Sequence, residues 1–416
     1  VAMCQARGWP VSVALAYPVP EVEDRVAQDN VLRLYELPAY RRHLGRLRKR
    51  WGLDRRRAGS VFSSCWSALR TDLPIAVRLA SFAHRRGVDL IHANNELLVN
   101  RTAILAARMI RRPVVSHQRG WAGRSRLTRL LGRWTDRVVA ISDYVTGTLI
   151  EAGLDGLKIQ RIYDGVDCER FGRAADRRVV ARRALGLAAT DEVIGLPAVL
   201  LPWKGHDMFL TAFARLADGR PNLRALLVGA SPAGAPDLSV ALRGQAAKLG
   251  VADRVCFTGH VAEMVDMYAA MDLVVHASQQ PEPFGLVVVE AMAAGKPVIA
   301  ADAGGPAEII RHGTDGWLYP MGDAAALTSA MARLLDDRPL RDGLAQRAPL
   351  RAAAFDQTAT DQAIAALYTD LLSQTRSIAS SGLILRMGWH GSRYSGPHAD
   401  GPHGSAYGGP MPPNTR

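Results

Sequence analysis

Two glutamates flank a predicted helix start near residue 285. Glu282 lies in a loop after a predicted strand, and Glu290 lies on the second turn of the predicted helix. The backbone N–H groups of Gly285, Leu286 and Val287, together with the positive end of the helix dipole, are typical of an anion site. Glu290 lies roughly 7.5 Å along the helix axis at ~1.5 Å per residue, which suits hydrogen bonds to hydroxyls one phosphate-to-ribose distance away. This order predicts a ligand with sugar, diphosphate and ribose in series, although the pair alone is more typical of two solvated glutamates.

The composition is that of a soluble globular protein. The chain has 416 residues, 48% of them hydrophobic and 22% charged, which fits two ordinary domains and excludes collagenous, coiled-coil and wholly disordered chains. No apolar run approaches the roughly 20 residues that span a bilayer, and no secretory signal precedes residue 10. The four cysteines, Cys4, Cys65, Cys168 and Cys256, lie too far apart for a zinc cage or a disulfide framework. We therefore expect a cytoplasmic protein.

Short β-branched runs alternate with helical patterns along the chain, which predicts parallel sheets covered by helices. A first series of strands is expected at residues 11–16, 32–37, 89–93, 113–117 and 137–141. A second series is expected at residues 193–199, 223–228, 255–258, 273–276, 297–300 and 316–318. The two series predict two α/β sheets in tandem, connected by residues 164–189, with the ligand in the cleft between them.

The composition changes near Ser377 to Gly, Pro, Ser and His. Such a segment buries too little apolar surface to offset the entropy of ordering it, so we expect disorder from residue 377 to residue 416. His390, His398 and His403 are irregularly spaced, which favours a tail without a metal site.

Most of the net positive charge lies in the first half of the chain. Its densest stretch, Arg41–Arg57, carries nine lysines and arginines interleaved with Leu44, Leu47, Trp51 and Leu53. One hypothesis is an interfacial helix on an anionic membrane surface, and the alternative is a solvated basic loop. Nucleic-acid binding is not expected, because no helix-turn-helix, zinc or RNP signature accompanies the charge.

Several motifs together resemble family 4 glycosyltransferases, which are retaining enzymes of the GT-B fold. The stretch from Glu282 to Glu290 resembles the family's motif of two glutamates separated by seven residues, within EPFGLVVVEAMAAGKPVIAADAGGPAEII. GHVAEMVDMYAAMDLVVHAS, KGHDMFLTAF, VVAISDYV and IYDGVD follow the family's order and spacing, and the resemblance covers roughly residues 6–375. It implies two Rossmann-like domains with an interdomain cleft: an acceptor-side domain at residues 1–175 and a donor-binding domain at residues 176–376 that includes the final helix.

The resemblance also implies roles for individual residues. Glu282 would lie by the donor sugar, Glu290 would hold the ribose hydroxyls, and Lys204 would neutralise the diphosphate. The backbone of residues 284–287, which are Phe284, Gly285, Leu286 and Val287, would bind phosphate or hexose. His117, at the end of a predicted strand, matches a histidine that reaches toward the sugar or acceptor; the alternative is a satisfied strand-end histidine. Arg119, Asn94 and Asn95 follow strand ends and are candidates by position alone.

The implied function is transfer of a hexose or related sugar from a nucleoside diphosphate sugar to a lipid-linked or cell-surface glycan, with retention and without a cofactor or metal. The catalytic residues would be His117, Lys204 and Glu282. The enzyme would be cytoplasmic, with the inner face of the membrane as a further hypothesis. The first alternative is a non-catalytic nucleotide-sugar or glycan-binding relative, and the second is an epimerase or phosphorylase of the same architecture.

Two departures from the family motivate the non-catalytic alternative. Relatives carry Gly-Arg five residues before the lysine, where this chain has Ala198 and Val199. Relatives also begin with a strand and a Gly-rich loop, whereas this chain opens on CQARGWPVSVA, which resembles the helix after that loop. The first strand is therefore expected to be absent, and the chain that starts at Val1 is interpreted as an incomplete reading of a longer protein.

Overall fold

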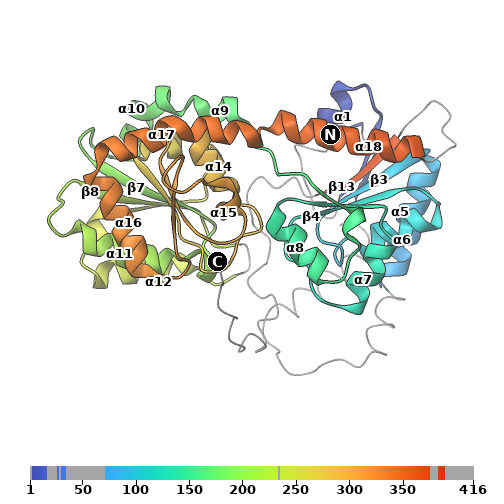
Figure 1. Cartoon of the computed structure of the whole chain (residues 1–416), viewed down its shortest axis with the longest axis horizontal. Helices are drawn as coiled ribbons and strands as arrows, with labels where there is room; N and C mark the ends of the chain where they lie inside the picture. Colours follow the sequence, from blue (N-terminus) through green and yellow to red (C-terminus); the bar gives the residue numbers. More distant parts are fainter. Residues whose placement is uncertain are drawn as a thin grey trace, which may run out of the picture.

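The computed structural model describes residues 2–15, 26–27, 30–33, 71–232, 235–374 and 383–388. Over these residues the chain forms two α/β units side by side, each built on one parallel sheet (Figure 1). The prediction of two tandem Rossmann-like units is confirmed. The basic stretch Arg41–Arg57 and the three tail histidines lie outside the described residues.

The first unit contains a sheet of seven described strands in the order β2-β1-β13-β3-β4-β5-β6. All neighbouring strands are parallel, and β3 and β4 are buried along their whole length. The strands are β1 (Val11–Leu15), β2 (Val31–Arg33), β3 (Val88–Asn94), β4 (Val114–Gln118), β5 (Arg137–Ala140), β6 (Ile159–Arg161) and β13 (Leu383–Gly388). Each strand predicted for the first half of the chain overlaps one of these.

Strand β13 corrects the expectation of a disordered tail over all of residues 377–416. Residues 383–388 pair with β1 on one side and β3 on the other, with Ile384 opposite Val11 and Leu90. The tail's mean composition is poor in apolar residues, but its Leu-Ile-Leu run is typical of a strand. The sequence predicts that the first strand of this sheet is absent. Strand β13 fills the interior position between β1 and β3.

The final helix, α18 (Gln357–Gln374), also differs from the expectation, which assigned it to the second domain. Its buried Leu367 and Tyr368 share an apolar cluster with Leu90 and Val115 of the first sheet. In Figure 1, α17 and α18 cross from one unit to the other along the same side of the molecule. The reason is that, among the described residues, the apolar side chains of α18 pack against the first sheet and not against the second.

The second unit contains a sheet of six described strands in the order β12-β11-β10-β7-β8-β9, all parallel. The strands are β7 (Glu192–Pro197), β8 (Leu223–Val228), β9 (Val255–Gly259), β10 (Leu273–His276), β11 (Val298–Ala301) and β12 (Trp317–Tyr319). Each overlaps a predicted strand. The middle strands β7 and β10 are almost wholly buried, as expected for a sheet covered on both faces.

Helices connect the strands and cover the sheets (Figure 1). In the first unit they are α1 (Ala2–Ala6), α5 (Leu73–Arg85), α6 (Arg101–Met109), α7 (Arg126–Arg133), α8 (Asp143–Glu151) and the short η4 (Gly156–Lys158). The link and the second unit contain α9 (Cys168–Gly172), α10 (Ala174–Ala184), η5 (Pro202–Lys204), α11 (His206–Ala217), α12 (Leu238–Lys248), η6 (Ala252–Arg254), α13 (Met264–Ala270), α14 (Leu286–Ala293), α15 (Gly305–Ile309), α16 (Ala324–Asp336), α17 (Arg338–Ala352) and η7 (Ala353–Phe355).

An aromatic cluster joins the two units beside the start of α14. The ring of Phe284 lies 5.8 Å from that of Tyr163 and 5.9 Å from that of Phe355. The Val166 N–H, just after Tyr163, donates to the Phe355 carbonyl oxygen at 3.0 Å. Both crossings of the chain between the units therefore pack against the loop that leads into α14, which holds that loop at the domain boundary.

Candidate functional site

Three polar side chains meet at the carboxyl edge of the second sheet. His276 is the last residue of β10, and Lys204 ends η5, the short helix that follows β7. Glu282 lies in the loop between β10 and α14. Because β7 and β10 are adjacent and parallel, the residues that follow them come together at one edge, where open parallel sheets bind their ligands.

The Glu282 carboxylate is the centre of this cluster. Lys204 Nζ donates to Glu282 Oε1 at 2.7 Å, and His276 Nε2 is hydrogen-bonded to Glu282 Oε2. The Ser278 hydroxyl donates to the same Oε2 atom at 3.1 Å. The carboxylate is thus held by three side chains, from η5, from the end of β10 and from the loop that follows β10, which fixes its direction.

The cluster is buried and charged. Lys204 and Glu282 expose only 7% and 13% of their side chains. Burial by itself would raise the pKa of the Glu282 carboxyl, but the Lys204 ammonium and the His276 imidazole hold that pKa well below its usual range. Glu282 is therefore ionised throughout the neutral range and can only accept hydrogen bonds.

Aromatic and imidazole groups surround Lys204. Its Nζ lies 4.2 Å from the centroid of the Trp203 ring, a cation–π contact. Burial, aided by the Lys204 charge, lowers the pKa of His206 to about 4, so that imidazole is neutral at neutral pH. The neutral His206 imidazole therefore adds no positive charge beside the Lys204 ammonium.

Helix α14 begins directly after the loop that carries Glu282. Its N-cap, Gly285, has φ 109°, a conformation that favours glycine, and no side chain caps the helix start. Phe284 and Gly285 are buried, whereas Leu286 and Val287 are partly exposed. The Phe284 side chain belongs to the apolar core, so any ligand contact of this residue falls to its backbone.

Glu290 lies on the next turn of α14 and has a different set of neighbours from Glu282. The Tyr268 hydroxyl, from α13, donates to Glu290 Oε2 at 2.8 Å and also reaches the Val287 carbonyl oxygen at 3.3 Å. The two glutamates therefore belong to separate polar clusters, one before the helix start and one along it.

Two adjacent glycines, Gly304 and Gly305, lie against the backbone of the Glu282 loop. The Gly305 N–H donates to the Glu282 carbonyl oxygen at 2.8 Å. A Cβ atom at Gly304 would lie 2.3 Å from that same oxygen, and one at Gly305 would lie 2.0 Å from the Phe284 carbonyl oxygen. The sequence Gly304-Gly305 is therefore required for the backbone to approach the loop this closely.

We predict that Gly304→Ala destabilises the protein by about 1–3 kcal/mol more than Gly313→Ala, because only the former drives a Cβ atom into backbone. Gly313 is a matched control, since it also has a positive φ, 70° against 63°, and its Cβ would meet nothing within 4 Å. Urea unfolding of both variants measures the difference. Equal losses in the free energy of unfolding would show that the loop moves aside for the new Cβ atom without loss of stability.

The predicted residue His117 lies near the carboxyl end of β4, an interior strand of the first sheet, in a second polar cluster. Its Nδ1 is 3.3 Å from His92 Nε2, and its Nε2 is 3.8 Å from Asp164 Oδ1. The Arg119 guanidinium donates to Asp164 Oδ2 at 2.7 Å and to Asn94 Oδ1 at 2.8 Å. The structure thus brings together His117, Arg119 and Asn94.

Asn95, and the positions 198 and 199 where relatives carry Gly-Arg, take other roles. The Asn95 side chain accepts from the Glu96 N–H at 2.9 Å, within its own turn. Ala198 and Val199 follow β7, where the Ala198 N–H donates to the Val228 carbonyl oxygen at 2.9 Å. The side chains at 198 and 199 supply no positive charge beside Lys204, as expected from the sequence.

The first unit contacts the Glu282 loop directly. Trp121 Nε1 donates to the Pro281 carbonyl oxygen at 3.1 Å, and the Ser142 hydroxyl donates to the Pro283 carbonyl oxygen at 2.6 Å. Glu308 of α15 in turn accepts from the backbone N–H groups of residues 143 and 144, at the start of α8. Both carbonyls beside Glu282 are thus bonded to the opposite unit.

Several residues of this arrangement were not predicted from the sequence, among them His276, Trp121, Ser142 and Glu308. His276 had a detectable signal, because it ends a strand six residues before Glu282. The other three act across the domain boundary, between positions more than 140 residues apart. No local pattern marks such contacts.

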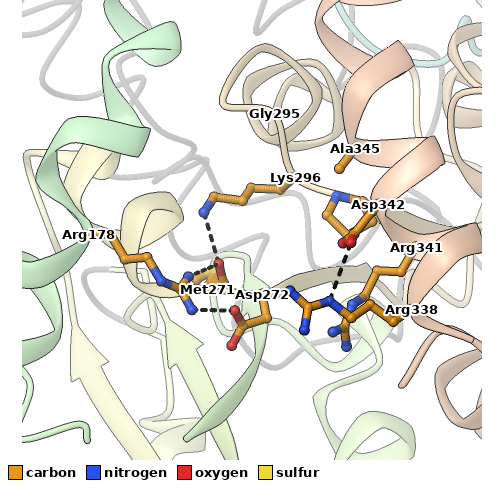
Figure 2. Close-up of a pocket in the computed structure, with 10 residues that line it drawn as sticks. Arg178, Met271, Asp272, Gly295, Lys296, Arg338, Arg341, Asp342 and Ala345 are labelled. Atoms are coloured by element: carbon orange, nitrogen blue, oxygen red, sulfur yellow. Dashed lines mark hydrogen bonds and ion pairs between the residues drawn. The ribbon is translucent and has the colours of Figure 1, made fainter. Parts of the chain in front are cut away.

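A separate cavity of about 230 Å³ lies at the opposite, amino edge of the second sheet (Figure 2). Its groups largely satisfy one another: Arg178 bonds Asp272 and the Met271 carbonyl oxygen, and Lys296 donates to that oxygen at 2.9 Å. Burial, aided by the charges of nearby arginines, lowers the pKa of Lys296 to about 8. This network ties β10 and β11 to α10, and it lies away from the Glu282 cluster.

Two family models match the chain in tandem. The model "Glycosyltransferase Family 4" matches residues 3–170, and "Glycosyl transferases group 1" matches residues 178–351. The first covers the described strands β1 to β6, and the second covers the whole second sheet. The chain belongs to glycosyltransferase family 4.

Proteins of known name that are similar in sequence support the same assignment. D-inositol 3-phosphate glycosyltransferase of Streptomyces scabiei is 33% identical over 305 residues, which is 71% of this chain and 65% of that protein. The lipopolysaccharide core biosynthesis mannosyltransferase LpsB of Rhizobium meliloti is 34% identical over 218 residues, which is 51% of this chain and 60% of that protein. The matches thus span somewhat less than two thirds of these relatives.

Among solved structures, Anabaena HepE in complex with UDP is 28% identical, with a TM-score of 0.70. The match covers 87% of this chain and 100% of HepE. HepE has also been solved with UDP-glucose, again with a TM-score of 0.70. The structural similarity therefore includes both units.

Proposed function

We propose that this protein is a retaining glycosyltransferase that moves a hexose or related sugar from a nucleoside diphosphate sugar to a lipid-linked or cell-surface glycan. The observation that carries the proposal is the buried Lys204–Glu282–His276 cluster next to the start of α14, with the Tyr268–Glu290 pair one turn further along. The complexes of HepE with UDP and UDP-glucose support a donor of this class.

Each part of the donor has a group of suitable chemistry in this arrangement. Glu290 is an acceptor for the ribose hydroxyls, and Glu282 is an acceptor for the hydroxyls of the sugar. The N–H groups at the start of α14 suit phosphate oxygens. Lys204 is the cation for the diphosphate, since a compact ammonium in a buried site stabilises the negative charge that develops on a leaving nucleotide.

His117 completes the proposed site from the first unit, where it faces the reacting sugar or the acceptor. With retention by front-face attack, the leaving diphosphate takes the acceptor proton, and no carboxylate nucleophile is needed. The positive charge comes from Lys204 and the helix amides, so we propose a reaction that needs neither a metal ion nor a cofactor.

A turnover assay with a donor panel tests the function. UDP-glucose and other nucleoside diphosphate hexoses are incubated with the protein and a mixed lipid-linked glycan acceptor in EDTA, and nucleotide release and glycan mass are followed. We expect release that depends on acceptor and continues in EDTA. Donor binding without transfer or hydrolysis would favour the non-catalytic alternative, and nucleotide-sugar conversion without acceptor would favour an epimerase.

The relatives, rather than the geometry, support the proposed acceptor class. LpsB is named for lipopolysaccharide core biosynthesis, and a lipid-linked glycan is the acceptor proposed for this chain by analogy. We accordingly propose that the protein works in the cytoplasm at the inner face of the membrane. Among the helices that the structure describes, none is long and apolar enough to cross a bilayer.

For the stretch Arg41–Arg57, we predict that replacing Arg48, Lys49 and Arg50 by glutamate weakens binding to vesicles that contain anionic lipid. Each basic residue near such a surface contributes about 1 kcal/mol, and salt screens the attraction. Cosedimentation at low and high salt measures the effect. Unchanged binding would make this stretch an ordinary solvated surface.

A further inference from the structure

A buried line of side chains connects α18 to His117. The Tyr368 hydroxyl of α18 is hydrogen-bonded to His92 Nδ1, and His92 Nε2 lies 3.3 Å from His117 Nδ1. Tyr368, His92 and His117 expose 1%, 0% and 2% of their surfaces. The line ends at His117 Nε2, which lies 3.8 Å from the Asp164 carboxylate.

The two ends of this line favour the same positions for the protons. A neutral imidazole carries one N–H and one acceptor nitrogen. If the Tyr368 hydroxyl donates to His92 Nδ1, then His92 Nε2 carries the proton and donates to His117 Nδ1. The proton of His117 must then be on Nε2, where the Asp164 carboxylate attracts it. The opposite direction would place the lone pair of Nε2 against that carboxylate.

The surroundings also fix the orientation of the rings. The His92 and His117 rings lie 5.3 Å apart, and the Tyr368 ring meets the His92 ring edge-on at 5.6 Å. The Asp164 carboxylate is itself held by Arg119. Neither imidazole can therefore turn over without breaking a hydrogen bond inside the core.

We propose that Tyr368 and His92 are positioning residues that hold His117 as its Nε2–H tautomer, a hydrogen-bond donor rather than a base. This proposal rests on the proposed function, because it assigns the direction in which His117 acts on the donor sugar or acceptor. It also gives the helix that returns to the first sheet a role in the site, since α18 supplies the hydroxyl at the far end of the line.

The experiment combines ¹⁵N NMR of histidine-labelled protein with steady-state kinetics. In the unaltered protein we expect Nδ1 of His92 and His117 to show unprotonated shifts and both Nε2 atoms to show protonated shifts. Tyr368→Phe keeps the ring but removes the hydroxyl, so both histidines should show mixed tautomers, and kcat should fall about three- to tenfold with KM for the donor changed less. Opposite tautomers in the unaltered protein would overturn the proposal.

Two further comparisons separate tautomer control from packing. Tyr319→Phe is the matched control, because the Tyr319 hydroxyl is buried in the second unit and, over the described residues, has no hydrogen-bond partner; this variant should leave both the NMR shifts and kcat unchanged. His92→Leu should lower kcat like Tyr368→Phe, and His92→Gln should restore most of it, since an amide offers both an acceptor and a donor. Equal kcat in the Leu and Gln variants would contradict the proposal.

His117→Ala distinguishes failure of this inference from failure of the proposed function. If His117→Ala lowers transfer while Tyr368→Phe changes neither the tautomers nor kcat, the inference about the line is wrong and the proposed function stands. If His117→Ala leaves transfer intact, the proposed role of His117 in the site is itself wrong.

Discussion

Replacing Lys204 by alanine is expected to lower donor turnover at least tenfold and to destabilise the fold by about 3–5 kcal/mol. The first effect follows from the loss of the cation proposed for the diphosphate. The second follows from Glu282, whose buried carboxylate would lose its 2.7 Å partner, and removing one member of a buried ion pair costs this much. Kinetics and urea unfolding of the same preparation measure both effects.

A second substitution separates these two effects. Combining Lys204→Met with Glu282→Gln removes both charges, so most of the stability should return while turnover stays low. Lys248→Ala is the matched control, because Lys248 is exposed at the end of α12, and this variant should match the unaltered protein in both measurements. Normal turnover in Lys204→Ala would remove this lysine from the proposed site.

Replacing Glu290 by alanine is expected to weaken donor binding at least tenfold, about 1.4 kcal/mol or more. The carboxylate is proposed to accept hydrogen bonds from two ribose hydroxyls, and hydrogen bonds to a charged group are the stronger class. Isothermal titration with the nucleoside diphosphate measures the change directly, apart from any effect on turnover.

The partner of Glu290 sharpens this prediction. Tyr268→Phe leaves the carboxylate in place but removes the hydroxyl that donates to it at 2.8 Å, so its effect should be smaller than that of Glu290→Ala. Glu169→Ala, at an exposed position of α9, should leave binding unchanged. If Glu290→Ala binds the nucleoside diphosphate normally, the ribose lies elsewhere.

Strand and helix positions of both units were largely predictable from the sequence, because they depend on local patterns. The apolar run Leu223–Val228 indicates a buried strand by its composition alone, and Gly285 favours a transition from loop to helix. Predictions from the sequence fail where the residues that contact each other are far apart along the chain. Nothing near Leu383 indicates that β1 and β3 leave a position between them for another strand.

The candidate site divides in the same way. Glu282, Glu290 and Lys204 could be identified because they occur within recognisable motifs. That Lys204 bonds Glu282, across 78 residues of sequence, could not be foreseen. Likewise, the link from Tyr368 to His92 joins positions 276 residues apart. The sequence indicated which groups are present, and only the fold shows which of them touch.

A crystal structure of the protein with UDP would test the central claim most directly. We predict a diphosphate whose oxygens lie within about 3.2 Å of backbone nitrogens at the start of α14, with Lys204 Nζ beside it and the ribose hydroxyls on Glu290. A nucleotide bound elsewhere, for example in the cavity beside Lys296, with the start of α14 unoccupied, would contradict it.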